Sequence, residues 1–238
     1  MTAGKPDPKR ATPEPHYTGH RDRLRQRFLE AGEDALADYE LLELILFGAI
    51  PRRDVKPLAK DLIKSFGGFA EVLMAAPDRL ASDGGLSRPA VAAIKAAAAA
   101  STRMLRQQAV GRPFLGSWQA VLDYLTLSIG YSKTEQFHLL FLDAQNTLIA
   151  DESQQHGTVD QAPVYPREVV RRALQLHASS IIMVHNHPSG RPDPSKADIA
   201  MTREVEKAAQ AVGISLHDHI VIGKNDHTSM RSLGLIGP

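Results

Sequence analysis

The chain changes its sequence pattern once, near residue 113, and this change limits the folds that it can adopt. From His20 to Arg106 apolar residues recur at helical spacing, and strand-like alternation is absent. The alanine run in 90–100 strengthens the helical pattern. Beyond this half, strand and helix patterns alternate along the chain. We therefore expect a small all-α domain followed by a domain of the α/β or α+β class.

Composition along the chain indicates where these domains begin and end. Residues 1–17 are rich in proline and charge with little to bury, so we expect a disordered tail there. The helical domain is expected over 18–110 and the mixed domain over 111–238, with Gly111-Arg-Pro113 as the linker. Hydrophobic residues make up 43% of the chain, which is enough to bury a sizeable core.

The mixed domain has the patterns of several strands and helices. Two apolar runs flank the turn Ala144-Gln-Asn146 and predict a β-hairpin. The run Ser180–Val184 is short and apolar, as in a buried strand. The expected helices cover 118–129, 166–174 and 196–212, and the expected strands cover 136–142, 147–156, 180–184, 214–222 and 228–233.

Composition also excludes several classes of protein. The chain has no cysteine, so disulfides, thiol nucleophiles and cysteine-ligated zinc sites are ruled out. No apolar run approaches the roughly 20 residues that a membrane span needs. The N-terminal sequence has no apolar segment, unlike a secretory signal. We therefore expect a cytoplasmic protein.

Charge is distributed unevenly between the two halves, although the net charge is only +1. Residues 1–113 hold 18 Lys and Arg against 14 Asp and Glu, and within them 50–113 holds 11 against 5. A basic excess of this kind is typical of a half that faces nucleic acid. A solvated helical surface explains the same charges equally well, so both interpretations stay open.

Two histidines stand at the end of the expected strand Ser180–Val184. Alternate strand residues face the same side, so the imidazoles of His185 and His187 can converge on one ion. Asp198 follows eleven residues after His187, and Ser195 precedes it by three, which gives the pattern H-x-H-x7-S-x2-D. Catalytic zinc sites use three protein ligands of these types and keep one position for water. The spacing therefore predicts one zinc ion held by His185, His187 and Asp198.

Each part of this pattern also has an ordinary structural interpretation. The segment Asn186-His-Pro-Ser-Gly190 has the composition of a turn. Ser195 and Asp198 fit a helix capping box, with Asp in place of the usual Glu. Taken singly, the structural interpretation is favoured for each part; taken jointly, the fixed spacing of four positions favours the metal site.

The pattern resembles the JAMM motif of the JAB/MPN metalloprotease superfamily, and more closely the RadC family. The resemblance extends along the chain beyond residue 17. The segments that carry it are Tyr39-Glu-Leu-Leu-Glu43, Ile50-Pro-Arg52 with Asp54, Gly157-Thr158-Val159, Val164-Tyr-Pro-Arg-Glu168, His185-Asn-His-Pro-Ser-Gly190, Pro194-Ser195 with Asp198, and Asp218-His-Ile-Val-Ile-Gly223.

This resemblance implies a JAB/MPN domain of cytidine-deaminase-like fold and a zinc-dependent hydrolase of amide or isopeptide bonds. The family's water-activating glutamate matches Glu152, whose alternative is an exposed hairpin carboxylate beside Asp151. Zinc lowers the pKa of bound water to about 7 and polarises the scissile carbonyl. Glu152 would then carry the proton to the leaving amine, and Ser195 would donate a hydrogen bond to the developing oxyanion.

Other residues support weaker hypotheses. His217 and His219 flank Asp218 on an expected strand and could support the metal ligands, or less readily hold a second metal. The segment from Gly84 to Lys95 resembles a helix–hairpin–helix turn, which presents backbone N–H groups to a phosphate with nearby Lys and Arg. It departs from the usual Gly-x-Gly hairpin, and simple packing of two helices is the alternative.

Two functions from different classes are consistent with these observations. The first is a zinc metallopeptidase or isopeptidase acting on an unidentified peptide or isopeptide substrate. The second is a DNA-associated, repair-related protein, or a metal-dependent nuclease, that binds DNA weakly through residues 18–110 and has an accessory JAMM site. The ligand set together with Glu152 favours the enzyme.

Overall fold

The computed structural model describes residues 19–109, 118–154, 164–224 and 226–237, and the chain divides into two compact units. The first unit holds the chain up to Val72 together with Asp78–Ile94, and the second holds Leu73–Pro77 together with the chain from Lys95. The boundary between Ile94 and Lys95 falls inside a helix, α6 (Arg88–Ala109). The tail expected at 1–17 and the linker expected at 111–113 lie outside the described residues.

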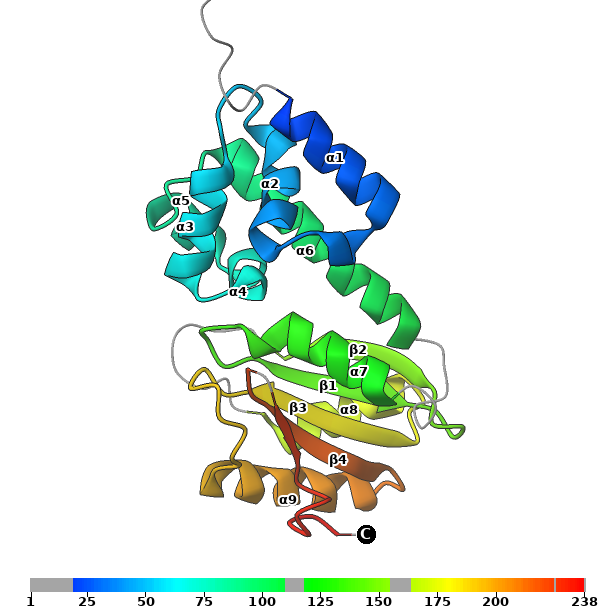
Figure 1. The fold of residues 1–238 in the computed structure, drawn as a ribbon. Helices are drawn as coiled ribbons and strands as arrows, with labels where there is room; N and C mark the ends of the chain where they lie inside the picture. The colour runs from blue at the N-terminus through cyan, green and yellow to red at the C-terminus, as the bar shows by residue number, and fades with distance from the viewer. Residues whose placement is uncertain (1–18, 110–117, 155–163, 225, 238) are drawn as a thin grey trace, which may run out of the picture. The chain divides into compact units, whose positions relative to one another are not determined.

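The described part of the first half is entirely helical, as the sequence predicts (Figure 1). Glycine ends one of these helices, because Gly67 at the end of α3 has φ 103°, which L side chains rarely adopt. The inward faces carry leucines that are almost inaccessible to solvent, among them Leu42, Leu46 and Leu62. The helices are α1 (His20–Ala31), η1 (Glu33–Ala35), α2 (Asp38–Ala49), α3 (Lys56–Phe66), α4 (Phe69–Met74), α5 (Pro77–Ser82) and α6 (Arg88–Ala109).

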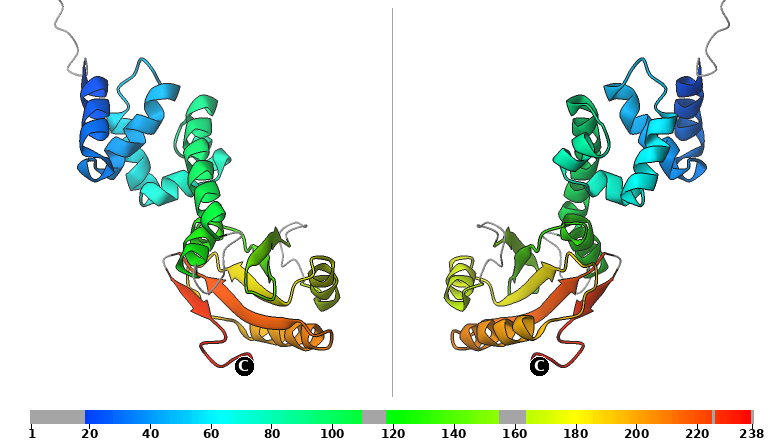
Figure 2. Two further views of the ribbon diagram at one scale, coloured as in Figure 1. Left: turned by 90° about the vertical axis from the view of Figure 1, so that its right-hand side faces the viewer. Right: turned by 90° about the vertical axis from the view of Figure 1, so that its left-hand side faces the viewer.

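A five-stranded mixed sheet of order β2-β1-β3-β4-β5 forms the centre of the second unit (Figures 1 and 2). The pair β3–β4 is parallel, and the other neighbouring strands are antiparallel. A parallel pair needs a crossover, and helix α9 (Lys196–Gln210) supplies it. The strands are β1 (Phe137–Leu142), β2 (Leu148–Ser153), β3 (Ser180–Asn186), β4 (Ser215–Ile222) and β5 (His227–Ser229).

Helices cover both faces of this sheet, so its central strands are buried on both sides. Helices α8 (Pro166–Gln175) and α9 pack on one face against alternate residues such as Leu139 and Met183. Helix α7 (Trp118–Leu125) packs on the other face against residues such as Leu140 and Val184. The unit is therefore a three-layer arrangement of helix, sheet and helix, and the loops at the strand ends border it.

The structure confirms the predicted fold class and most of the predicted elements. The helix expected over 118–129 changes at Thr126, where a π-helical turn, Thr126–Gly130, replaces its last part. The second hairpin strand ends at Ser153, and the continuation expected to 156 lies partly outside the described residues. None of the helices in the described ranges combines the length and apolar character that a membrane span requires.

Candidate metal centre

Strand β3 ends between the two motif histidines. His185 lies within β3, opposite Phe137 of β1 and Val221 of β4, and is completely buried. Its imidazole stacks on the Phe137 ring with the ring centroids 6.0 Å apart. His187 follows the strand end, and its N–H donates to the carbonyl of Ile222 at 3.1 Å. Both histidines are thus fixed by the parallel pair β3–β4.

The carboxylate comes from the first turn of α9. Ser195 caps this helix: its hydroxyl accepts the N–H of Asp198 at 3.1 Å, and its own N–H donates to Asp198 Oδ2 at 2.7 Å. This reciprocal pair is the capping box that the sequence predicts, with Asp in place of Glu. The cap holds the Asp198 side chain at the helix start, and Oδ1 stays outside the capping bonds.

Three donor atoms from these elements gather around one point. His185 Nε2 lies 3.0 Å from His187 Nε2, and the Asp198 oxygens lie 3.6 Å from His185 Nε2 and 3.5 Å from His187 Nε2. Tetrahedral zinc with ligands at about 2.0–2.2 Å separates its donor atoms by roughly 3.3–3.6 Å. The two His–Asp separations agree with this range and the His–His separation is shorter, so the three side chains lie close enough together to hold one ion.

The protonation of His187 and Asp198 also suits a cation. His187 Nδ1 lies 3.0 Å from the carbonyl oxygen of Arg191, which can only accept, so Nδ1 carries the proton and Nε2 is bare. Burial alone would raise the pKa of the Asp198 carboxyl, but His185 and the hydroxyl and N–H of Ser195 hold it well below its ordinary value. The Asp198 carboxylate and Nε2 of His187 therefore present lone pairs to the same point.

His219 and Thr202 lie directly behind His185. His219 Nε2 is 2.8 Å from His185 Nδ1, and its Nδ1 is 2.5 Å from the hydroxyl of Thr202 in α9. Complete burial, and next the neighbouring charge of His185, lower the pKa of His219 well below its ordinary value, so its ring is neutral. His219 thus contacts a candidate ligand, as the hypothesis of a supporting role requires.

His217 does not join this group. Strand β4 contains a bulge at this point, because Ile181 pairs with Leu216 whereas Ile182 pairs with Asp218. The bulge breaks the simple alternation by which His217 and His219 would otherwise share a face. In the described ranges, the only group of His, Asp and Glu side chains close enough to hold a metal is His185, His187 and Asp198.

Glu152 lies on the same face of the sheet as His185 but outside this group. It stands opposite Leu139 of β1, whose other neighbour is Met183 of β3. Two strand spacings, about 10 Å, therefore separate its backbone from β3. Its carboxylate accepts hydrogen bonds from Arg172 Nε in α8 at 2.8 and 2.9 Å and also from Arg172 Nη2. Glu152 thus lies on the face of the sheet that carries His185, and its carboxylate is paired with Arg172.

Asn186 and Thr202 are site residues that the sequence patterns did not single out. Asn186 lies between the two histidines in sequence, and its side chain is buried. Its amide oxygen accepts the N–H of Gln136 at 2.7 Å, and its amide nitrogen donates to the carbonyls of Ser132 and Thr134. It thereby ties the loop before β1 to the end of β3. A buried amide flanked by two motif histidines is the one signal that could have identified it; Thr202 gives none.

Lys95, the last residue of the hairpin-like segment, binds backbone carbonyls. Its ammonium donates to the carbonyls of Leu73 at 2.9 Å and Ala75 at 3.0 Å, and burial lowers its pKa. These two bonds occupy the Lys95 ammonium. The hairpin turn itself is present, with Gly85 at φ 60° before the N-terminus of α6.

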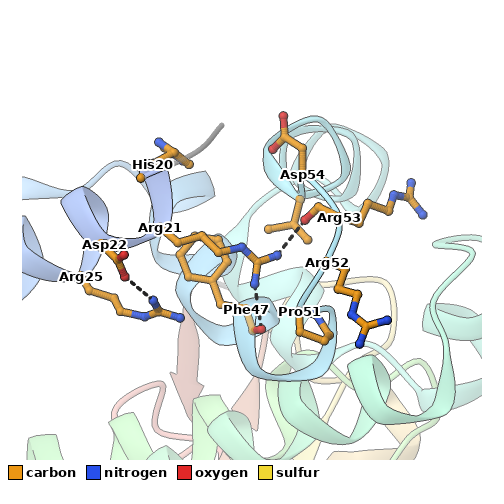
Figure 3. A pocket seen from close by; sticks show the side chains of 11 residues that line it. His20, Arg21, Asp22, Arg25, Phe47, Pro51, Arg52, Arg53 and Asp54 are labelled. Atoms are coloured by element: carbon orange, nitrogen blue, oxygen red, sulfur yellow. Dashed lines mark hydrogen bonds and ion pairs between the residues drawn. The ribbon is translucent and has the colours of Figure 1, made fainter. Parts of the chain in front are cut away.

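An arginine-lined pocket of about 410 Å³ lies in the first unit, beside the loop between α2 and α3 (Figure 3). Arg21 holds this loop in place by donating to the carbonyls of Phe47, Ile50 and Arg53 at 2.5–3.1 Å. Arg52 and Arg53 are exposed and, among the described residues, make no side-chain ion pair. They also line a neighbouring pocket of about 520 Å³ that reaches Gly85 and Ser87.

Comparison with known proteins agrees with this site. A family profile described as RadC-like JAB domain matches residues 115–235. A UPF0758 protein of Rhodobacter capsulatus is 56% identical over 213 residues, which cover 90% of this chain and 100% of that protein. The resemblance that the motif carries is therefore confirmed: the chain belongs to the RadC family, with a JAB domain of the JAMM-like metallohydrolase kind.

Proposed function

We propose that this protein is a zinc-dependent metallopeptidase or isopeptidase of the JAMM type. The observation that carries the proposal is the gathering of donor atoms on His185, His187 and Asp198, whose separations of 3.0–3.6 Å lie close to the roughly 3.3–3.6 Å edges of a zinc tetrahedron. The side chains of His187 and Asp198 are 19% and 14% exposed, so the group borders solvent. A fourth position open to water and substrate is what distinguishes a catalytic from a structural zinc site.

The chain's own residues have separate roles in this proposal. His185, His187 and Asp198 hold one zinc. When bound, the zinc would polarise the carbonyl of the substrate and lower the pKa of a water molecule. The Ser195 hydroxyl accepts a bond from Asp198 N–H and still has its own proton to donate to the oxyanion of the substrate. Glu152 takes the proton of the attacking water once its carboxylate leaves Arg172.

Metal and activity measured together test this proposal. Purified full-length protein is expected to contain one zinc per chain by elemental analysis. It should cleave some members of a panel of peptide and isopeptide substrates; a chelator should abolish the cleavage, and added zinc should restore it. Cleavage that survives complete removal of zinc, or a chain that takes up no zinc at all, would contradict the proposal.

A second candidate function, weak DNA binding by the first half, is favoured by Arg52 and Arg53. Both are exposed on a loop that Arg21 fixes, and both line the two pockets beside this loop. Guanidinium groups without carboxylate partners suit phosphate oxygens, which they can contact in a bidentate manner. The same zinc site could then act on a phosphodiester bond in place of an amide.

The double variant Arg52→Ala/Arg53→Ala is expected to weaken binding of duplex DNA by the full-length chain. If each arginine neutralises one phosphate, the slope of log affinity against log salt should fall by about 1 per arginine. Fluorescence anisotropy over a salt series measures both quantities. Lys64→Ala is the control, because Lys64 is an exposed cation in the same unit that lines neither pocket.

Equal effects of the two variants would mean that general charge, and not this loop, attracts DNA. Incubating labelled DNA with the zinc-loaded protein in the same series tests the nuclease alternative. Cleavage of DNA without cleavage of any peptide would favour that alternative over the peptidase.

A further inference from the structure

An ion pair joins the proposed base Glu152 on β2 to Arg172 on α8. Arg172 Nε donates to Oε1 of Glu152 at 2.9 Å and to Oε2 at 2.8 Å, and Arg172 Nη2 also donates to Oε1. On the other side of the guanidinium, Nη1 donates to Gln175 Oε1 at 3.3 Å. The Nε–Nη2 edge of Arg172 is therefore directed at the carboxylate of Glu152, while Nη1 is bonded within α8.

This ion pair and the proposed reaction compete for the same carboxylate. A base must accept a proton from water, but both oxygens of Glu152 already accept hydrogen bonds from Arg172. The pair is not enclosed in the core, because the side chains of Arg172 and Glu152 are 38% and 28% exposed. Ion pairs with this exposure are weak. An acceptor that replaced Glu152 at Arg172 would therefore free the base.

The geometry at Arg172 indicates which kind of group suits this exchange. The donors of a guanidinium form a planar fork that matches the two oxygens of a carboxylate. Glu152 itself shows that a carboxylate fits the Nε–Nη2 edge of Arg172. A second carboxylate at this edge would keep the charge of Arg172 paired, whereas a neutral amide would leave it unpaired.

Arg172 also lies within reach of a substrate bound at the candidate metal ligands. Glu152 is in line with Met183 of β3, which precedes His185 by two residues. The backbones of Glu152 and His185 are thus separated by about 7 Å along the strands and about 10 Å across them. An extended peptide advances by about 3.3 Å per residue. A peptide with its scissile carbonyl at the ligands can therefore place a carboxylate at Arg172 within about three residues of that carbonyl.

We propose that Arg172 is a specificity-determining residue that binds a carboxylate of the substrate, and that this carboxylate displaces Glu152 and frees it to act as the base. The inference rests on the peptidase function proposed above and names its substrate class. The substrate is a peptide or isopeptide with an acidic side chain or a free C-terminal carboxylate close to the scissile bond. A neutral substrate leaves Glu152 paired with Arg172 and is cleaved slowly.

A titration of the metal-free, full-length protein tests carboxylate binding without any hydrolysis. The probes are N-acetyl-trialanine, which ends in a free carboxylate, and its C-terminal amide at the same ionic strength. In ¹⁵N-labelled protein, the Nε–H signal of Arg172 should shift with the free acid and stay in place with the amide. Arg171 is the internal control, because it donates two hydrogen bonds to Glu168 of its own helix and its signal should not move.

Steady-state kinetics of the zinc-loaded protein test the consequence for specificity. Each peptide that is cleaved is compared with the form in which its carboxylate is replaced by an amide. The wild type should prefer the acid. In Arg172→Gln the KM for the acid should rise about 10-fold, as expected for a lost charge-assisted hydrogen bond. On the amide form, the kcat of Arg172→Gln should exceed that of the wild type, because Glu152 is then free. Arg171→Gln should keep the wild-type preference.

Several results would overturn the inference. One is a free acid that shifts the Arg171 and Arg172 signals equally, or that shifts neither. Another is a preference for the acid that survives in Arg172→Gln or is lost to the same extent in Arg171→Gln. The titration uses the wild type, so it decides the inference even if Arg172→Gln does not fold. A wild type that cleaves no peptide would refute the peptidase function, whereas carboxylate binding at Arg172 is still decided by the titration.

Discussion

Replacing His185, His187 or Asp198 with alanine is expected to remove most of the bound zinc from the protein. Apparent zinc affinities in four-ligand structural sites correspond to about 10–16 kcal/mol. If the ligands share that energy, losing one costs about 3–4 kcal/mol, or roughly 10²–10³ in affinity. A two-ligand remnant at this level cannot retain zinc through purification, so elemental analysis of each variant measures the effect directly.

Thermal stability gives an independent measurement of the same loss. Zinc at about 100 times its dissociation constant stabilises the folded state by about 2.7 kcal/mol, provided that it binds only that state. The wild-type Tm should therefore rise on addition of zinc, and the Tm of the three variants should not. Each variant is compared with its own zinc-free sample, because His185 is completely buried and its truncation also leaves a cavity.

His217→Ala is the matched control for these variants. His217 belongs to the same strand as His219 but lies outside the group of potential ligands. Its replacement should leave one zinc per chain. Full zinc content in all three ligand variants, or zinc loss in His217→Ala alone, would mean that the zinc binds elsewhere in the protein.

The elements that carry the site could be predicted because their sequence patterns are local. All six residues of β1 are buried, and an unbroken apolar run such as 137–142 is typical of a strand covered on both faces. The left-handed Asn146, with φ 57°, lies within the predicted turn of the hairpin. The two histidines were expected to converge because a strand repeats every second residue, and their Nε2 atoms do lie together.

The partners of the site residues could not be predicted in this way, because they depend on how elements pack. Thr202 meets His219 only because α9 lies across β4, and 17 residues separate the two in sequence. The same holds for Glu152 and Arg172, which are 20 residues apart and meet where α8 covers the sheet. The partners of Lys95 were equally unpredictable, since the carbonyls that it binds precede it by about a helix and a loop.

Glu152→Gln is expected to keep zinc and the fold but to lose hydrolysis by about 10²–10⁴-fold, the usual contribution of a positioned base. Three observations lead to this expectation. Glu152 occupies the His185 face of the sheet, and the residue in line with it on β3, Met183, precedes His185 by two. Its carboxylate is 28% exposed, so it can exchange Arg172 for a water molecule. Glutamine has the same shape but cannot accept the water's proton.

The competing interpretation makes Glu152 and Arg172 a structural ion pair at the edge of the sheet. Partly exposed pairs of this kind contribute about 0–1 kcal/mol, so Glu152→Gln would then be silent in both stability and turnover. Glu168→Gln is the matched control, because Glu168 also pairs with an arginine of α8: Arg171 donates two hydrogen bonds to its Oε2 at the helix surface. We expect it to leave turnover unchanged.

Asp151→Asn, the neighbouring substitution, is not a silent control. The side chain of Asp151 is only 3% exposed; it accepts a hydrogen bond from Tyr124 and pairs with His138 Nδ1 at 2.8 Å. Burial alone would raise the pKa of its carboxyl, but His138 and Tyr124 lower it, so the ionised form stabilises the fold above the ordinary Asp pKa. That stability is lost as the pH falls through the lowered pKa. Asp151→Asn should therefore lower the free energy of unfolding at neutral pH.

The Glu152 experiment consequently compares Glu152→Gln with Glu168→Gln, with zinc content measured in each and turnover assayed on the substrate that the panel provides. Arg172→Gln adds the decisive arm, because it frees the Glu152 carboxylate without removing it. If Glu152 is the base, Arg172→Gln keeps far more activity than Glu152→Gln; if the ion pair alone matters, the two variants behave alike. Near wild-type turnover in zinc-loaded Glu152→Gln would end the assignment, and zinc loss in that variant would make Glu152 a fourth ligand of a structural site.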